Sequence, residues 1–378
     1  MAQQSIHQTV PSQGLDKAPQ KYISRASLDK IPTSFASCSL GPPNNLPDLF
    51  DRLDAIQKAG FDGIELSFPD ILSHGKKLFK RDIDPKDFDT ICEVAKDIKK
   101  KCDELGLVIM MLQPFSNFEG WQAGSEKRED AYERARGWIR IMETVGCDLL
   151  QVGSTDSDIK SLDLGAVKSD LQALADMLGE HNYGLAYENW CWSTHAPGWR
   201  EVWEHLKNSD RNNFWLCLDT FQTAGGEWAD PTTESGLIEK DHNGASLSQQ
   251  ALQDKFKRSL EDLSKTIPKD KIRVLQVSDA YKMNPPLSPE PDDQGLRPRG
   301  GWSHDYRPLP LSGGYLPVVD VAKAVLKTGY RGWFSYEVFD GGSDGKKTEC
   351  DIYSYAKSAM EVHKKLLDAC AEEPPEGY

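Results

Sequence analysis

The chain alternates short apolar runs with longer segments in which apolar residues recur every three or four positions. The short runs are typical of buried strands, and the longer segments are typical of amphipathic helices. The pattern predicts strands at residues 34–41, 61–68, 107–115, 148–154, 184–190, 215–221, 272–277 and 333–339. It predicts helices at residues 46–59, 85–105, 126–145, 162–178, 199–206, 248–264, 318–326 and 351–370.

Eight strands that alternate with eight helices indicate a parallel β/α architecture. The strands are apolar throughout, as expected where both faces of a sheet are covered. A closed (β/α)₈ TIM barrel and an open doubly wound sheet both fit this order. We favour the barrel because the units number eight and no GxGxxG turn follows a strand. We expect one catalytic domain at residues 31–371, with a flexible arm at 1–30 and a flexible tail at 372–378.

Two of the connections that follow strands are long. Residues 229–247 are polar and contain glycine, and residues 280–317 are rich in proline. In a barrel, connections of this kind lie on the face that carries the active site. We therefore expect them to form lids or walls of a substrate pocket, and surface insertions without a role are the alternative.

Four side chains with oxygen donors lie where apolar runs end. They are Glu188, Asp219, Gln276 and Glu337, in the segments GLAYENW, WLCLDTF, RVLQVSDA and WFSYEVF. The C-terminal ends of neighbouring barrel strands meet at one face, and carboxylates gathered there repel one another unless a cation compensates them. For any one of them, a structural carboxylate paired with arginine is the alternative. An all-oxygen donor set is typical of Mg²⁺ or Mn²⁺, with Co²⁺ as a third option, so we predict a divalent-metal site.

Other residues are expected to line the same mouth and contact the substrate. Arg307 ends the polar part of the long loop, where its planar guanidinium would grip a substrate carboxylate, and His304 lies just before it. Gln113 lies near the end of the third predicted strand, Asp70 follows the second, and Trp190 follows Glu188 closely. A surface position is the alternative for the basic residues.

Three residues are candidates for the general acid and base. His74 follows the second predicted strand and His195 follows the fifth. Histidine exchanges protons near neutral pH, so either side chain suits proton transfer. Glu65 points toward the pocket by the same strand logic and is the third candidate. An ordinary exposed histidine is the alternative for each of the first two.

The charge balance limits the partners that the protein would have. The chain has 45 Lys and Arg against 59 Asp and Glu, a net charge of −14, so its surface repels nucleic acid and anionic membranes. No apolar run approaches the roughly 18 residues of a membrane span, and the N-terminus lacks the pattern of a signal peptide. The eight cysteines form no CxxC pair, which indicates a reducing compartment. We expect a cytoplasmic protein with a small carboxylate substrate, and homo-oligomerisation stays open.

Several motifs resemble those of a known family. They are SCSLG, GFDGIELS, LQPFSNFEGW, YENWCWST, CLDTFQTAG, LQVSDA, YLPV and GYRGWFSYEVF, between about residues 34 and 360. The chain is similar to the xylose isomerase-like barrels and, within them, to the fungal 3-dehydroshikimate dehydratases. The resemblance maps their metal ligands onto Glu188, Asp219, Gln276 and Glu337. The chain departs from the family pattern at residues 301–317, at His195 and after the second strand, all of which line the expected substrate mouth.

The resemblance implies a reaction. It would be the metal-dependent dehydration of 3-dehydroshikimate to protocatechuate through a metal-stabilised enolate, in quinate and shikimate catabolism. Arg307 would hold the ring carboxylate, and His74, His195 or Glu65 would move the protons. Two alternatives remain: a sugar or inosose isomerase, epimerase or dehydratase on the same barrel, and a catalytically silent barrel that only binds a ligand.

Overall fold

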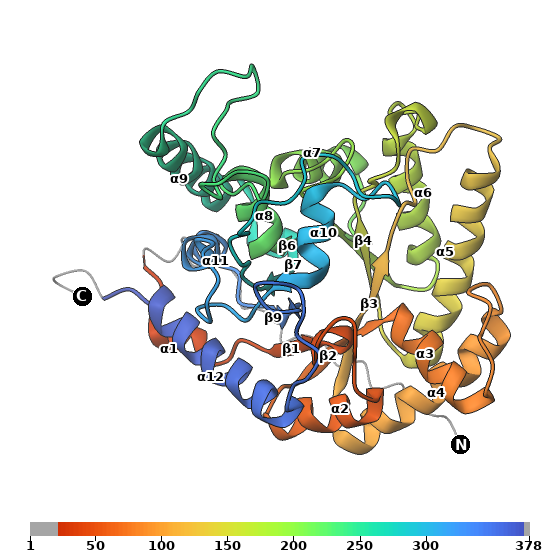
Figure 1. Ribbon diagram of the computed structural model, residues 1–378. Helices are drawn as coiled ribbons and strands as arrows, with labels where there is room; N and C mark the ends of the chain where they lie inside the picture. Colours follow the sequence, from red (N-terminus) through yellow and green to blue (C-terminus); the bar gives the residue numbers. More distant parts are fainter. Residues whose placement is uncertain (1–21, 374–378) are drawn as a thin grey trace.

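The computed structural model describes residues 22–373, and eight parallel strands close into a barrel surrounded by helices (Figure 1). The order around the barrel is β1-β2-β3-β4-β5-β6-β7-β9. These strands are β1 (Thr33–Ala36), β2 (Gly63–Ser67), β3 (Val108–Phe115), β4 (Leu149–Gly153), β5 (Gly184–Glu188), β6 (Phe214–Asp219), β7 (Ile272–Val277) and β9 (Trp333–Tyr336). The predicted (β/α)₈ barrel is confirmed.

All eight predicted helices are present. They are α2 (Leu49–Lys58), α4 (Phe88–Leu105), α5 (Glu126–Val145), α6 (Val167–Gly179), α7 (Trp199–Ser209), α9 (Gln249–Thr266), α11 (Val318–Lys327) and α12 (Ile352–Cys370). The sequence pattern started three of them too early, namely α2, α4 and α6. Asp48 and Asp87 accept hydrogen bonds from backbone N–H groups of the first turns of α2 and α4, so these caps set where the helices begin. No helix between residues 22 and 373 combines the length and the apolar character that crossing a membrane requires.

Other elements were not predicted because they are short or lie within loops. They are the helices α1 (Arg25–Leu28), α3 (Phe68–Phe79), α8 (Thr220–Glu227) and α10 (Pro298–Asp305), the strands β8 (Tyr306–Arg307) and β10 (Phe339–Asp340), and the 3₁₀ turns η1 (Ser37–Ser39), η2 (Ile159–Ser161) and η3 (Lys269–Lys271). Strand β8 pairs antiparallel with β10. The long loop at 280–317 is therefore folded in part, and Arg307 of its β8 strand bonds to Asp219 at the end of β6 and to Glu337 just after β9.

The barrel interior has an apolar half and a polar half. Side chains alternate along a strand, so the residues two positions apart in β5, β6 and β7 face inward together. Ala186, Cys217 and Val274 belong to a small apolar cluster closed by the rings of Trp215 and Trp333. Two residues further along the same strands stand Glu188, Asp219 and Gln276, all at most 1% exposed. In these three strands, the period thus places the inward-facing polar side chains at the C-terminal end.

The described part of the expected N-terminal arm packs against the C-terminal helix. Residues 1–21 and 374–378 lie outside the described residues, so the arm and tail are only partly in view. Ile23 and Leu28 are buried, Arg25 pairs with Asp368 of α12, and the Ile23 N–H donates to Glu372. The packed chain therefore begins before residue 31.

A buried ion pair joins three elements beside the first strand. Arg52 of α2 lies 2.7 Å from Asp70 of α3, and both side chains are at most 4% exposed. Asp70 also accepts from the Ser37 hydroxyl of η1 at 2.6 Å. The pair fixes the start of α3, the longest of the helices that the sequence pattern missed.

Replacing Arg52 by Met should lower the free energy of unfolding by about 3–5 kcal/mol, because Asp70 would remain buried without its counter-charge. Urea denaturation of the purified variant measures this difference. Lys76→Met is the matched control, since the Lys76–Asp82 pair is 64% and 85% exposed and should contribute nothing measurable. Equal stability of the Arg52→Met variant and the unaltered protein would contradict the role of the pair.

Candidate metal centre

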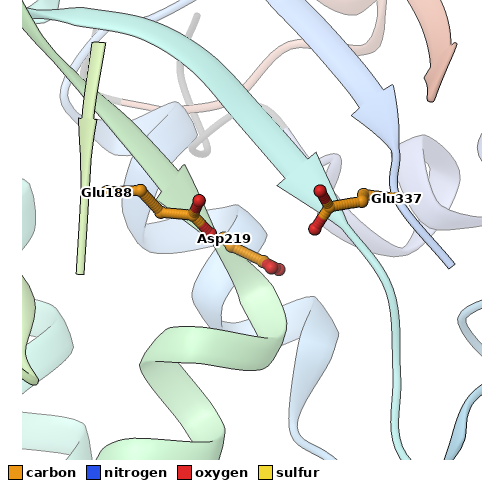
Figure 2. Close-up of side chains that lie close together, drawn as sticks. All are labelled: Glu188, Asp219 and Glu337. Atoms are coloured by element: carbon orange, nitrogen blue, oxygen red, sulfur yellow. The ribbon is translucent and has the colours of Figure 1, made fainter. Parts of the chain in front are cut away.

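Three carboxylates from three strands converge at the C-terminal end of the barrel (Figure 2). Glu188 ends β5, Asp219 ends β6 and Glu337 directly follows β9. One oxygen atom of each lies within 4.8 Å of the others. Their exposed fractions are 1%, 0% and 8%. The structure thus brings together three of the four residues expected to bind metal, and it does so out of reach of bulk water.

The cluster is electrostatically costly. Burial raises the pKa of Glu188 well above its usual value, and the charges of Glu337 and Asp219 raise it further. Burial also raises the pKa of Asp219, an effect that the nearby Arg307 opposes. Like charges in a site of low polarity repel strongly, so a cluster of this kind calls for positive charge.

Arg307 supplies part of that positive charge. Its guanidinium lies 2.6 Å from Asp219 and 2.9 Å from Glu337, and the side chain is 1% exposed. It also donates to the hydroxyls of Ser278 and Ser303. Arg307 therefore lies at the site, as expected. Its N–H groups, however, donate to the protein's own carboxylates and hydroxyls and are not directed at a substrate.

The remaining charge and the donor atoms fit a divalent cation. When ionised, the three carboxylates and one guanidinium leave two negative charges uncompensated. Within residues 22–373, the Oε1 atom of Glu188 is buried and has no hydrogen-bond partner, which costs free energy unless a ligand meets it. Carboxylate oxygens are the donors that hard cations such as Mg²⁺ and Mn²⁺ take. The residues present therefore suit such an ion.

Gln276 lies beside this cluster but is held by other groups. It is fully buried on β7, in register with Asp219 of β6. Its Nε2 donates to Glu65 at 2.9 Å, and its Oε1 accepts from the Cys217 thiol at 3.2 Å. Its amide oxygen is thus engaged by a thiol, and its role as a fourth ligand stays a prediction.

Glu65 and Gln113 line the other side of the mouth. Glu65 is fully buried on β2, and burial together with the charge of Glu337 raises its pKa. Its Oε1 lacks a partner among the described residues. Gln113 is buried near the end of β3, where its amide nitrogen lies 3.6 Å from the Cys38 sulfur. Both positions agree with the expectation that these residues face the pocket.

His74 and Asp70, expected at the pocket, instead bind groups on neighbouring helices. His74 lies on α3, with its ring 4.4 Å from that of Phe50 on α2 and its Nε2 atom 2.9 Å from Asp97 on α4. Asp70 is committed to the ion pair with Arg52. The reason is the unpredicted α3, which turns both side chains toward other helices.

His195 lies behind the barrel wall. Its Nε2 is 3.0 Å from an oxygen of Glu119, which also accepts from the Tyr187 hydroxyl and the Thr155 N–H, each at 2.8 Å. Burial raises the pKa of Glu119, but the interactions with His195 and the other hydrogen bonds outweigh it and leave the pKa lowered. Tyr187 and Glu188 are consecutive on a strand, so they face opposite sides. His195 is thus not brought to the carboxylates.

Trp190 and His304 lie at the rim. The Trp190 Nε1 donates to Glu188 Oε2 at 3.1 Å, and its ring stacks on that of Trp192 at 5.1 Å. The indole lies so close to Gly153 that a Cβ atom there would be 2.2 Å from the ring. His304 is exposed on α10, edge-on to Trp192.

Sequence reasoning missed Gln151. It lies on β4 with an exposed fraction of 1%, and its Nε2 donates to Glu188 Oε2. The available signal was the one that identified Glu188, namely a polar residue inside an apolar run, here LLQVG. Glu119 gave no comparable signal because it lies in a loop.

The fold of the chain is matched by comparisons with known proteins. The sequence profile of the xylose isomerase-like TIM barrel family matches residues 53–365, and the chain belongs to this family. It is 30% identical over 319 residues to a 3-dehydroshikimate dehydratase of Neurospora crassa, an alignment that covers 81% of this chain and 86% of the relative.

Two further relatives are longer than this chain. A 3-dehydroshikimate dehydratase of Pseudomonas aeruginosa is 26% identical over 90% of this chain, which spans only 43% of that protein. The solved structure of a xylose isomerase-like TIM barrel/4-hydroxyphenylpyruvate dioxygenase fusion protein aligns with a TM-score of 0.64 at 23% identity. That alignment covers 92% of this chain and 45% of the fusion protein, so it supports the fold of the barrel part.

Replacing Arg307 by Met should lower the stability of the metal-free protein by about 3–5 kcal/mol, because Asp219 and Glu337 lose their buried partner. Added Mn²⁺ should then raise the melting temperature more in the variant than in the unaltered protein. Differential scanning fluorimetry with and without Mn²⁺ measures both effects.

The control is Arg297→Met, since Arg297 donates to the Trp192 carbonyl and the Thr194 hydroxyl. The rise in melting temperature that Mn²⁺ causes in this control should equal the rise in the unaltered protein. The account of Arg307 as a counter-charge is wrong if Mn²⁺ raises the melting temperature of Arg307→Met by no more than it raises that of the unaltered protein.

Proposed function

We propose that the protein is a metal-dependent hydro-lyase that converts 3-dehydroshikimate to protocatechuate, in the catabolism of quinate and shikimate. The observation that carries the proposal is the buried cluster of Glu188, Asp219 and Glu337 in a chain similar over most of its length to a dehydratase of this name. A barrel that binds sugars or inositols would share the cluster, but the relatives found at 26% and 30% identity carry the dehydratase name.

Glu188, Asp219 and Glu337 would hold a divalent ion such as Mg²⁺, Mn²⁺ or Co²⁺, and Gln276 would be the fourth donor if its amide turned away from Cys217. When bound, it supplies a Lewis acid for the negative charge that develops on the substrate ketone oxygen as the neighbouring carbon loses its proton.

The chain's own residues prepare the site for an anionic substrate. Arg307 keeps a permanent positive charge against Asp219 and Glu337, which offsets part of the repulsion that a substrate carboxylate meets. Burial keeps water away from the carboxylates, so their interactions are stronger than at the surface. Trp190 and Trp192 form a stacked apolar wall at the rim, against which a six-membered ring would lie.

Glu65 is the acid–base candidate that remains inside the barrel. His74 and His195 are bound to Asp97 and Glu119 away from the carboxylates. The Oε1 of Glu65 is buried and unpartnered within the described chain, so it is the atom that would hold or release a proton. Elimination removes a proton and a hydroxyl as one water, and formation of the aromatic ring makes the reaction effectively one-way.

Purified protein should form protocatechuate from 3-dehydroshikimate, lose this activity after exhaustive chelation and regain it when Mg²⁺, Mn²⁺ or Co²⁺ is added. Glu188→Gln should abolish turnover even with added metal, because it removes a charged oxygen donor from the cluster. The absorbance of the product follows the reaction directly.

Glu104→Gln on the exposed side of α4 is the matched control and should retain full activity. Two results would count against the proposal. Full activity in metal-free protein would contradict the metal dependence. No turnover of 3-dehydroshikimate with any of the three ions would contradict the assigned reaction.

A further inference from the structure

Two hydrogen-bond donors meet on a single oxygen of Glu188. The amide Nε2 of Gln151 and the indole Nε1 of Trp190 both donate to Oε2, the second at 3.1 Å. The other oxygen, Oε1, is buried and accepts no hydrogen bond from residues 22–373. The two oxygens of this carboxylate are therefore in different situations.

We propose that Gln151 and Trp190 are positioning residues that fix the Glu188 carboxylate so that Oε1 alone faces the metal. The inference rests on the metal site proposed above and adds residues to it. A glutamate with both oxygens free can rotate about its last torsion and bind through one or both of them. Two donors on Oε2 remove that freedom, and hydrogen bonds of this kind to a ligating carboxylate raise metal affinity.

The chain is built to hold both donors in place. Gln151 lies on β4 beside Ala186 of β5, so its inward side chain reaches Glu188, two residues further along the neighbouring strand. Gln151 is 1% exposed, and water does not compete for its amide. The indole of Trp190 lies over Gly153, where a side chain would displace it. Gly153 at the end of β4 thus leaves the space that the indole of Trp190 occupies.

The other two carboxylates are held differently. Asp219 accepts from the Phe221 N–H at 2.8 Å through Oδ1 and from Arg307 through Oδ2. Glu337 accepts from Arg307 through Oε2. Each of these is oriented in part by a charged group, which also weakens its attraction for a cation. The two groups that donate to Glu188 are neutral, so they fix its geometry without adding a counter-charge in contact with it.

The test is the dissociation constant for Mn²⁺, measured by isothermal titration calorimetry on metal-free protein. Gln151→Met keeps the length of the side chain and removes the donor, and Trp190→Phe keeps an aromatic ring and removes the N–H. We expect each to weaken Mn²⁺ binding by about 10–100-fold. Trp192→Phe is the matched control, because the Trp192 N–H donates to Asp156 at 3.0 Å. The dissociation constant of this variant for Mn²⁺ should equal that of the unaltered protein.

The outcomes separate this inference from the proposed function. Tight binding by the unaltered protein together with unchanged binding by Gln151→Met and Trp190→Phe overturns the positioning role and leaves the metal site intact. No binding by the unaltered protein removes the site and the inference with it. An equal loss in Trp192→Phe and Trp190→Phe also overturns the inference, since the stacked rings and not the N–H would then be responsible. If Gln151→Met does not fold, as circular dichroism would show, Trp190→Phe against Trp192→Phe decides the question.

Discussion

The structure depends on the placement of three carboxylates out of water at one end of a barrel. Glu188, Asp219 and Glu337 are each at most 8% exposed, and one oxygen of each lies within 4.8 Å of the others. Such a group stays ionised only if positive charge meets it. The Arg307 guanidinium provides one charge, and a divalent cation would provide the other two. The neighbouring features of the site are arranged around this requirement.

The strand period explains why the barrel can carry such a cluster and still fold. Each inward-facing carboxylate on β5 and β6 is preceded, two residues earlier, by a small apolar residue, Ala186 or Cys217. The apolar half of the barrel is closed by Trp215 and Trp333. Its hydrophobic contacts stabilise the fold without polar groups that would need buried partners. The polar half is then free to be shaped by the loops, and the loop after β7 brings Arg307 into it through the small β8–β10 sheet.

The sequence predicted what depends on local pattern. The barrel, its eight helices and the approach of Glu188, Asp219 and Glu337 all follow from periodicity and from the rule that strand ends meet at one face. The destinations of loop side chains could not be predicted in this way. His195 turns behind β5 because Glu119, 76 residues away in the chain, accepts its hydrogen bond, and no local pattern encodes that contact.

Arg307 and Gln151 also show that local sequence does not predict contacts between residues that are distant in the chain. Arg307 was expected at the site for the right reason, its position at the end of the polar loop, but its bonds to Asp219 and Glu337 depend on two distant strands. Gln151 carried a usable signal, a polar residue within an apolar strand, yet its partner became evident only when β4 and β5 were seen side by side. The contacts seen in the structure therefore assign to these two residues roles that residue type and spacing left open.

The central claim is that one divalent cation is shared by three distant carboxylates. The most direct measurement is a crystal structure of the protein soaked in Mn²⁺, with anomalous diffraction used to locate the ion. The account predicts one strong anomalous peak about 2 Å from an oxygen of each of Glu188, Asp219 and Glu337. A map with no peak among these three side chains, at a Mn²⁺ concentration that saturates other sites, would contradict it.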